Sequence, residues 1–156
     1  MNKKRQLRYW DSSVFLGLLN DEPERVNVCQ GVIESAERNE VHIVTSAITL
    51  VEVIKLRGEQ PLGQEHEETI QKFFEQEFII IRPVDTSIGL AARNLIWEYA
   101  HLQPKDSIHA ATAVEYQVAS LDTFDDDLIR LNGNIGDPGL RIGHPNLSYQ
   151  PELSGV

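Results

Sequence analysis

The sequence contains a single cysteine, Cys29, among its 156 residues. One thiol cannot form an intramolecular disulfide, and it excludes zinc sites built from several cysteines. Cys29 also shares the helical periodicity of the apolar residues around it, which predicts a packing role and not a nucleophile. This cysteine usage is typical of a reducing compartment, so we expect the protein to be cytoplasmic.

Long hydrophobic runs are also missing. No apolar stretch approaches the roughly 18 residues that a membrane-spanning helix needs. The basic residues at the start of the chain are not followed by the apolar segment of a signal peptide. Internal repeats and low-complexity tracts are absent as well. At 156 residues we therefore expect a single domain over 1–156, with no membrane partner.

Basic residues are scarce, with 14 lysines and arginines against 24 acids and a net charge of −10. This balance argues against broad nonspecific binding to nucleic acid and against binding to anionic membranes. The acidic excess is partly local, because a run of glutamates at 65–77 has the pattern of a solvated helix face. The cations gather near the start of the chain and after Glu52: Lys3, Lys4, Arg5, Arg8, Lys55 and Arg57.

Short apolar segments alternate with amphipathic ones along the chain. The pattern predicts strands at 7–11, 41–45, 78–81 and 118–121, with a further edge strand at 140–142. It predicts helices at 13–20, from 22 onward, from 47 onward, at 64–76, 86–102 and 104–113, and one after the acids of 122–127 that runs through 131. Strands that alternate with helices indicate a three-layer α/β/α domain with a central, mostly parallel sheet.

Acidic residues recur at the ends of these elements. Asp11 lies where the first strand becomes a helix, which is where open α/β sheets bind ligands. Asp125 follows another strand of the same sheet, while Glu52 and Asp106 lie on helices. Taken singly, each acid has a simpler explanation as a helix cap or a surface charge. Glu52 is the least easily explained in this way, because an unpaired carboxylate in its apolar segment would be costly.

The joint pattern is more specific than any one of its members. Carboxylates drawn to one place repel each other unless a cation lies between them, and oxygen ligands favour Mg²⁺ or Mn²⁺. His109 lies one turn after Asp106, but its alanine-rich surroundings favour a packing histidine. Ser107 and His109 do not indicate a hydrolase triad, since the strained Gly-x-Ser-x-Gly turn is absent.

These residues resemble the PIN-domain ribonucleases, many of which are VapC-type toxins. The resemblance covers residues 7–132 and rests on Asp11-Ser12-Ser13, the helical Glu52, the segment Asp-Ser-Ile-His-Ala-Ala-Thr-Ala at 106–113, and Thr123-Phe124-Asp125. The remaining residues, 133–156, are expected to form an edge strand and a C-terminal tail.

The resemblance implies a set of site residues. The metal-binding acids would be Asp11, Glu52, Asp106 and Asp125, with Ser13 and Thr123 as accessory polar groups and Asp127 joining through water. Asp122 adds a further carboxylate to this last cluster, in which we favour Asp125 as the ligand.

The resemblance also implies an activity and partners. The protein would be an endoribonuclease that uses Mg²⁺ or Mn²⁺ to hydrolyse RNA phosphodiester bonds, leaving 5′-phosphate and 3′-hydroxyl ends. A cognate antitoxin and a homodimer are expected by the same analogy. Because the chain is acidic, contact with RNA would depend on a local basic rim formed by residues 3–8, Lys55 and Arg57.

Three other interpretations were compared with this one. A metal-dependent adhesion site needs Asp-x-Ser-x-Ser, but Phe15 occupies the last of those positions. A phosphotransferase of the Asp-x-Asp type needs an acid where this chain has Ser13. The alternative that stays open is a catalytically silent PIN-like module that binds RNA or a protein.

Overall fold

The computed structural model describes residues 5–54 and 64–146. Four cations of the expected basic rim, Lys3, Lys4, Lys55 and Arg57, lie outside these residues, as does the tail from 147 onward.

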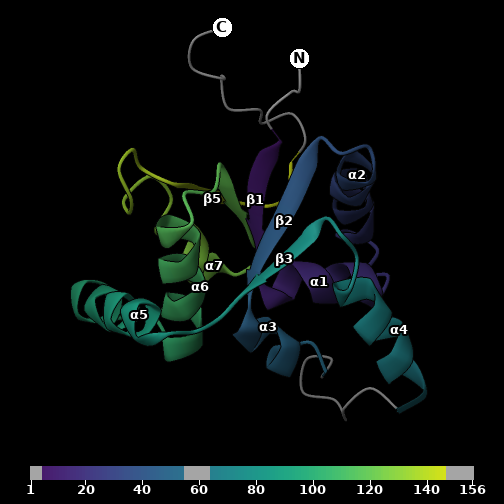
Figure 1. Cartoon of the computed structure of the whole chain (residues 1–156). Helices are drawn as coiled ribbons and strands as arrows, with labels where there is room; N and C mark the ends of the chain where they lie inside the picture. Colours follow the sequence, from purple (N-terminus) through teal and green to yellow (C-terminus); the bar gives the residue numbers. More distant parts are fainter. Residues whose placement is uncertain (1–4, 55–63, 147–156) are drawn as a thin grey trace, which may run out of the picture.

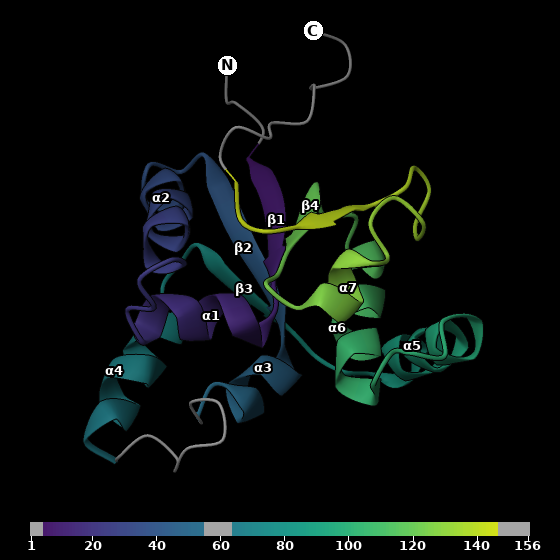
Figure 2. The same cartoon turned by 180° about the vertical axis from the view of Figure 1, so that it is seen from behind.

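The described residues form a five-stranded parallel sheet with the strand order β3-β2-β1-β4-β5. The strands are β1 (Gln6–Trp10), β2 (Val41–Ser46), β3 (Ile79–Arg82), β4 (Ser120–Asp122) and β5 (Arg141–Gly143). Figure 1 shows β1 near the middle of the sheet, and Figure 2 shows β5 beside β4 at one edge. The predicted parallel sheet and the edge strand after residue 133 are confirmed.

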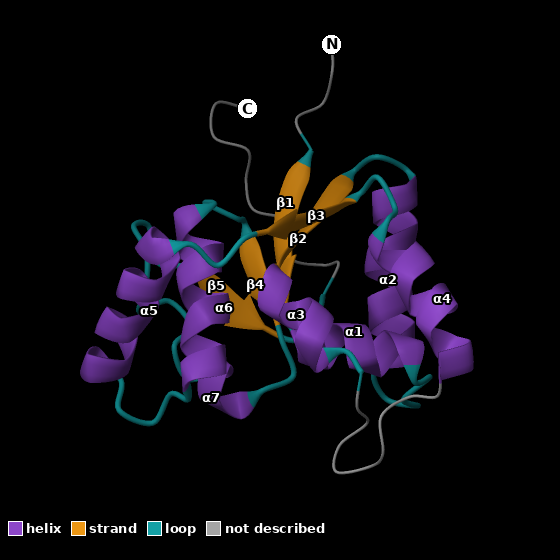
Figure 3. Ribbon diagram, turned by 60° about the horizontal axis from the view of Figure 1, so that its bottom comes forward, coloured by secondary structure: helices purple, strands orange, loops and turns teal. Residues whose placement is uncertain are grey.

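Helices cover both faces of the sheet, as Figure 3 shows. One face carries α1 (Ser12–Leu19), α2 (Val26–Glu37) and α4 (Gln64–Phe74). The other carries α6 (Pro104–Glu115) and α7 (Asp126–Ile129), with α5 (Thr86–Glu98) packed on the outside of α6. The three-layer α/β/α architecture is therefore confirmed. No helix of the described ranges is long and apolar enough to cross a membrane.

The alternation of side chains along β1 produces a core on each face. Trp10 packs with Phe15 and the helices α1, α2 and α4, whereas Tyr9 packs with Leu121 and the α6 side. Cys29 is fully buried in the first core, and burial raises the pKa of its thiol to about 12. A thiol that is protonated at physiological pH is a poor nucleophile, which agrees with its predicted packing role.

Three helices depart from their sequence predictions by more than a residue or two at an end, or in their burial. Helix α2 begins at Val26, because the segment around Pro23 forms a turn. Helix α5 ends at Glu98, although Leu102 beyond it is buried as expected. The short α3 (Ala47–Glu52) is not embedded in the core, since Leu50 and Val51 are 46% and 73% exposed. Glu52 itself is only 17% exposed and Val53 after it is 2% exposed, so the apolar sequence marks a partly buried carboxylate, as expected, although Leu50 and Val51 face outward.

A buried ion pair joins the two central strands β1 and β4. The Arg8 guanidinium donates to both oxygens of Asp122, from Nε and Nη2, at 2.8 Å each. Trp10 Nε1 and Ser120 Oγ donate to the same carboxylate, and the Arg8 and Asp122 side chains are each 2% exposed. Arg8 is thus not part of a surface rim, contrary to the prediction. The carboxylate of Asp122 is fully engaged in holding the sheet together.

The ion pair gives a prediction about stability. Asp122→Asn leaves the Arg8 guanidinium buried without its counter-charge, so we expect a loss of about 3–5 kcal/mol in the free energy of unfolding. Urea unfolding followed by circular dichroism measures this loss. The control is Glu68→Gln, which removes an exposed ion pair with Lys72 on α4 and should cost too little to resolve. Equal losses in the two variants would contradict a structural role for the Arg8–Asp122 pair.

Candidate functional site

A pocket of about 160 Å³ lies where the carboxyl ends of the central strands meet the first turn of α6. Its lining includes all four predicted metal-binding acids, which are spread over more than 100 residues of the sequence: Asp11, Glu52, Asp106 and Asp125. Parallel strands end at the same edge of a sheet, and this brings Asp11 after β1 close to Asp125 after β4.

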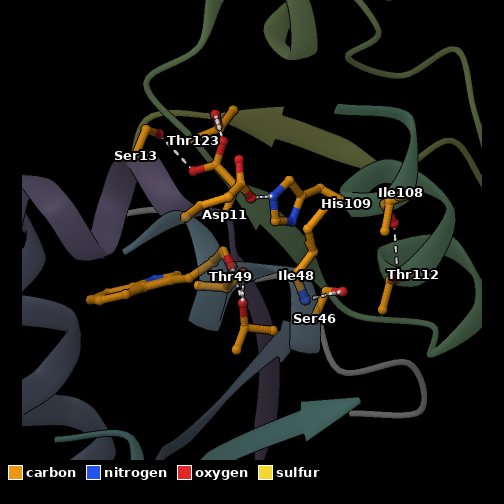
Figure 4. Close-up of polar contacts among 12 residues, drawn as sticks. Asp11, Ser13, Ser46, Ile48, Thr49, Ile108, His109, Thr112 and Thr123 are labelled. Atoms are coloured by element: carbon orange, nitrogen blue, oxygen red, sulfur yellow. Dashed lines mark hydrogen bonds and ion pairs between the residues drawn. The ribbon is translucent and has the colours of Figure 1, made fainter. Parts of the chain in front are cut away.

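Asp11 lies at the centre of a hydrogen-bond network and is only 3% exposed. Its Oδ1 accepts a hydrogen bond of 2.6 Å from Ser13 Oγ and caps α1 through the Val14 amide at 3.4 Å. Its Oδ2 accepts a hydrogen bond from Thr123 Oγ1. Figure 4 shows Ser13 and Thr123 on either side of this carboxylate. Asp11 is therefore both a helix cap and a lining residue of the pocket.

The hydroxyls of Ser13 and Thr123 link the two strand ends. Ser13 Oγ accepts from the Phe124 amide at 3.0 Å, and Thr123 Oγ1 accepts from the Asp125 amide at 2.9 Å. Each hydroxyl thus donates its proton to Asp11 and accepts a hydrogen bond from a backbone amide in the loop after β4. Ser13 also lines the pocket, whereas Thr123 is fully buried behind it. This arrangement fits the accessory roles that the family resemblance implies for both residues.

The negative charge of the pocket is incompletely balanced. Burial raises the pKa of Asp11. Burial, and secondly the nearby Asp125 carboxylate, raise the pKa of Asp106 to about 6, although Lys105 and His109 act in the opposite direction. Asp125 itself caps α7 by accepting from the Asp127 amide at 2.9 Å. Burial thus accounts for the shift at Asp11, whereas at Asp106 the nearby carboxylate adds to burial.

Glu52 has a partner that the sequence analysis did not assign to it. His109 Nε2 lies 2.7 Å from Glu52 Oε1, and His109 Nδ1 lies 2.6 Å from the Tyr9 hydroxyl. The His109 side chain is 2% exposed, so its predicted burial is confirmed. Its ring nevertheless lines the pocket and contacts a carboxylate, which makes it more than a packing residue. Its place at the pocket could be predicted from the sequence, because His109 lies one turn after Asp106, but its pairing with Glu52 could not.

Asp127 is not among the residues that line the pocket. Its side chain is 45% exposed and lies 3.7 Å from Arg130 Nη1. Two cations that the sequence analysis did not single out do line the pocket, Arg25 and Lys105. Lys105 could have been predicted from the sequence, because it directly precedes Asp106. Arg25 could not, because its place at the pocket depends on the turn before α2.

The pocket fits a divalent cation in the chemistry of its donors. Carboxylate and hydroxyl oxygens suit Mg²⁺ or Mn²⁺, and a cation would offset both the burial and the Asp125 carboxylate, which together raise the pKa of Asp106. Within residues 5–54 and 64–146, no three acidic, histidine or cysteine side chains are close enough together to hold one ion directly. Mg²⁺ keeps several of its waters when it binds proteins, so it does not require all its ligands from side chains.

Fold and pocket together define an α/β protein with a carboxylate-lined site at the carboxyl edge of its sheet. The family model of the PIN domain matches residues 8–134 of this chain. The chain therefore belongs to the PIN domain family, whose members are typically metal-dependent nucleases. A search of the curated proteins found no match.

Solved structures of low sequence identity share the fold. The chain is similar to a chain of VapBC2 from Rickettsia felis bound to a promoter DNA fragment, with 14% identity, a TM-score of 0.66, and coverage of 90% of this chain and 100% of that one. It is also similar to a chain of a toxin–antitoxin complex from Klebsiella pneumoniae, with 18% identity and a TM-score of 0.57, over 78% of this chain and 89% of that one. A third similar structure is FitAB bound to a DNA fragment, with 18% identity and a TM-score of 0.58, over 88% of this chain and 94% of that one.

The crowded carboxylates predict that the site costs stability when no metal is present. The pKa of Asp106 is higher in the fold than in the unfolded chain, so folding takes up a proton between about pH 4 and 6, and stability falls as the pH rises through that interval. Asp106→Asn removes this cost. In EDTA at pH 7.5 we expect the variant to be more stable than the wild type by about 1–2 kcal/mol, a figure reduced for the water that reaches the pocket.

Urea unfolding at pH 7.5 and pH 4 measures the effect, with Glu98→Gln on the exposed side of α5 as the control. The gain of Asp106→Asn should shrink at pH 4, where the wild-type carboxyl is largely protonated. A gain that is the same at both pH values, or a loss at pH 7.5, would contradict the expected repulsion.

Proposed function

We propose that this protein is a divalent-metal-dependent endoribonuclease that hydrolyses RNA phosphodiester bonds. The observation that carries the proposal is the convergence of Asp11, Glu52, Asp106 and Asp125 on one pocket in a chain of the PIN domain family. Metal-assisted phosphodiester hydrolysis needs such oxygen ligands at one place, beside a space that a phosphate can enter.

The roles of the residues follow from their contacts. Asp11, Glu52, Asp106 and Asp125 would hold the ion, some directly and the others through its waters. The ion would supply a water of lowered pKa and neutralise charge on the phosphate. Ser13 and Thr123 keep Asp11 in place by donating to its two oxygens. Asp127, which lies outside the pocket lining, would act only through water.

Two cations of the pocket are suited to receive the RNA backbone. Arg25 lies with its Cζ 4.5 Å from the centre of the Phe124 ring and pairs with Glu22 at 3.3 Å. Gly17 permits this packing, because a Cβ there would lie 3.2 Å from Arg25 Cβ and 3.3 Å from Phe124 Cε2. Lys105 lines the same pocket next to Asp106. Together they would offset the acidic net charge where the phosphate must enter.

We further propose that the protein is the toxin of a toxin–antitoxin pair, present in the cytoplasm and silenced by a cognate antitoxin. This rests on the family and on the named toxin–antitoxin complexes among the similar structures. A homodimer is proposed as well. Helix α5 supplies apolar surface for such a contact, since Leu90 and Trp97 are 57% and 76% exposed.

Cleavage assays test the proposed chemistry. Purified protein is incubated with a mixture of structured and single-stranded RNAs in Mg²⁺, Mn²⁺ or EDTA. We expect cuts that need the metal, and a rate at least about 100-fold lower in Asp11→Asn and Asp125→Asn, because each substitution removes a charged ligand. Asp126→Asn is the matched control, since Asp126 is adjacent to Asp125 but is exposed and does not line the pocket.

Two results would contradict different parts of the proposal. Full activity in a folded Asp11→Asn protein would overturn the metal-site assignment. No cleavage of any RNA by the wild type, together with no binding of Mn²⁺ in calorimetry, would favour the catalytically silent binding module.

The proposed phosphate contact has its own test. Arg25→Gln should raise KM for RNA about tenfold, the value expected for one hydrogen bond to a charged group, while kcat changes by less than about threefold. Arg93→Gln is the control, because Arg93 also lies over an aromatic ring, 5.3 Å from the centre of Trp97, but on α5. An unchanged KM in Arg25→Gln, or an equal rise in both variants, would exclude Arg25 as an RNA contact.

A further inference from the structure

Glu52 reaches the pocket from an element with little packing of its own. Helix α3 has six residues, of which Thr49 is the buried one. Leu50 and Val51, the two residues before Glu52, are both exposed, and Val53 after it is the residue that anchors the end of the helix in the core. A carboxylate at the end of such a helix is free to turn toward water unless another part of the protein holds it. The packing of α3 alone therefore does not explain how Glu52 keeps its place at the pocket.

His109 has the opposite surroundings. It lies in the middle of α6, where Ala110, Ala111, Thr112 and Ala113 are all buried. Figure 4 shows its ring pointing from α6 toward Asp11. Its Nε2 lies 2.7 Å from Glu52 Oε1, so a well-packed helix contacts the poorly packed one through this hydrogen bond. His109 is thus placed to fix the Glu52 carboxylate.

The partners of the ring define its protons. An ionised carboxylate can only accept, so His109 Nε2 donates to Glu52. In a neutral ring Nδ1 is then the acceptor, and the Tyr9 hydroxyl, 2.6 Å away, is its donor. A tyrosine phenol carries its proton at neutral pH and can therefore donate it here. Tyr9, His109 and Glu52 form one directed chain of hydrogen bonds.

We propose that Tyr9 and His109 are positioning residues for the divalent-cation site, and that they hold the Glu52 carboxylate where a bound ion needs it. This inference rests on the proposed function. Partners that orient a metal ligand in this way commonly change metal affinity 10–100-fold when they are removed. Tyr9 belongs to β1, two residues before Asp11, so the same strand orients two of the proposed ligands.

The binding of Mn²⁺ alone to the full chain, measured by calorimetry, tests the proposal without any cleavage reaction. His109→Gln keeps an amide nitrogen near the position of Nε2, whereas His109→Asn keeps polar atoms near Nδ1 and leaves Glu52 without its donor. We expect Kd for Mn²⁺ to rise about tenfold or more in His109→Asn and less than about threefold in His109→Gln. Glu52→Gln shows how much affinity is lost when the carboxylate itself is removed.

Tyr9→Phe removes the hydroxyl from the Tyr9–His109–Glu52 hydrogen-bond chain and should raise Kd for Mn²⁺ about threefold. If His109→Asn does not fold, this variant tests the positioning role. A wild-type Kd in Tyr9→Phe and in any folded His109→Asn would overturn the positioning role, even if both unfold at lower urea. Rescue of Kd by Gln but not by Asn supports it, because lost packing alone would not distinguish the two amides. Failure of the wild type to bind Mn²⁺ would instead overturn the proposed function, and this inference with it.

Discussion

The constraint on which the structure depends is the meeting of several carboxylates at one edge of a parallel sheet. Strands β1 and β4 are neighbours and end side by side, so the acids that follow them cannot be far apart. Helices α3 and α6 add Glu52 and Asp106 to the same pocket. Much of the surrounding polar structure serves these groups: Ser13 and Thr123 donate to Asp11, and His109 lies against Glu52.

The two buried acids Asp122 and Asp106 differ in how their charge is balanced. Asp122 is neutralised by Arg8 and receives further hydrogen bonds, so it contributes to the sheet and takes no part in the pocket. Asp106 lies beside another carboxylate, and its raised pKa records the cost. Uncompensated charge of this kind is typical of functional sites, where stability is given up for binding or chemistry. The difference between these two acids separates structure from candidate function in a chain with 24 acidic residues.

The sequence was sufficient to predict the layers, the parallel sheet and the four acids of the pocket. Those features depend on local patterns: apolar runs, caps, and acids at the ends of elements. What could not be predicted depends on pairings between distant residues. Arg8 looked like part of a basic surface, because nothing in its neighbourhood reveals that Asp122, 114 residues later, pairs with it. The contact between His109 and Glu52, 57 residues apart, and the entry of Arg25 into the pocket were missed for the same reason.

The pocket lined by Asp11, Glu52, Asp106 and Asp125 is proposed to bind a divalent cation. The most direct measurement of this binding is the anomalous scattering of Mn²⁺ in crystals of the protein grown or soaked with that ion. The account predicts a manganese peak in the pocket, with at least one of these carboxylates as a direct ligand and the rest reached through water. A well-ordered pocket without a peak at millimolar Mn²⁺, or a peak only at exposed acids elsewhere, would contradict it.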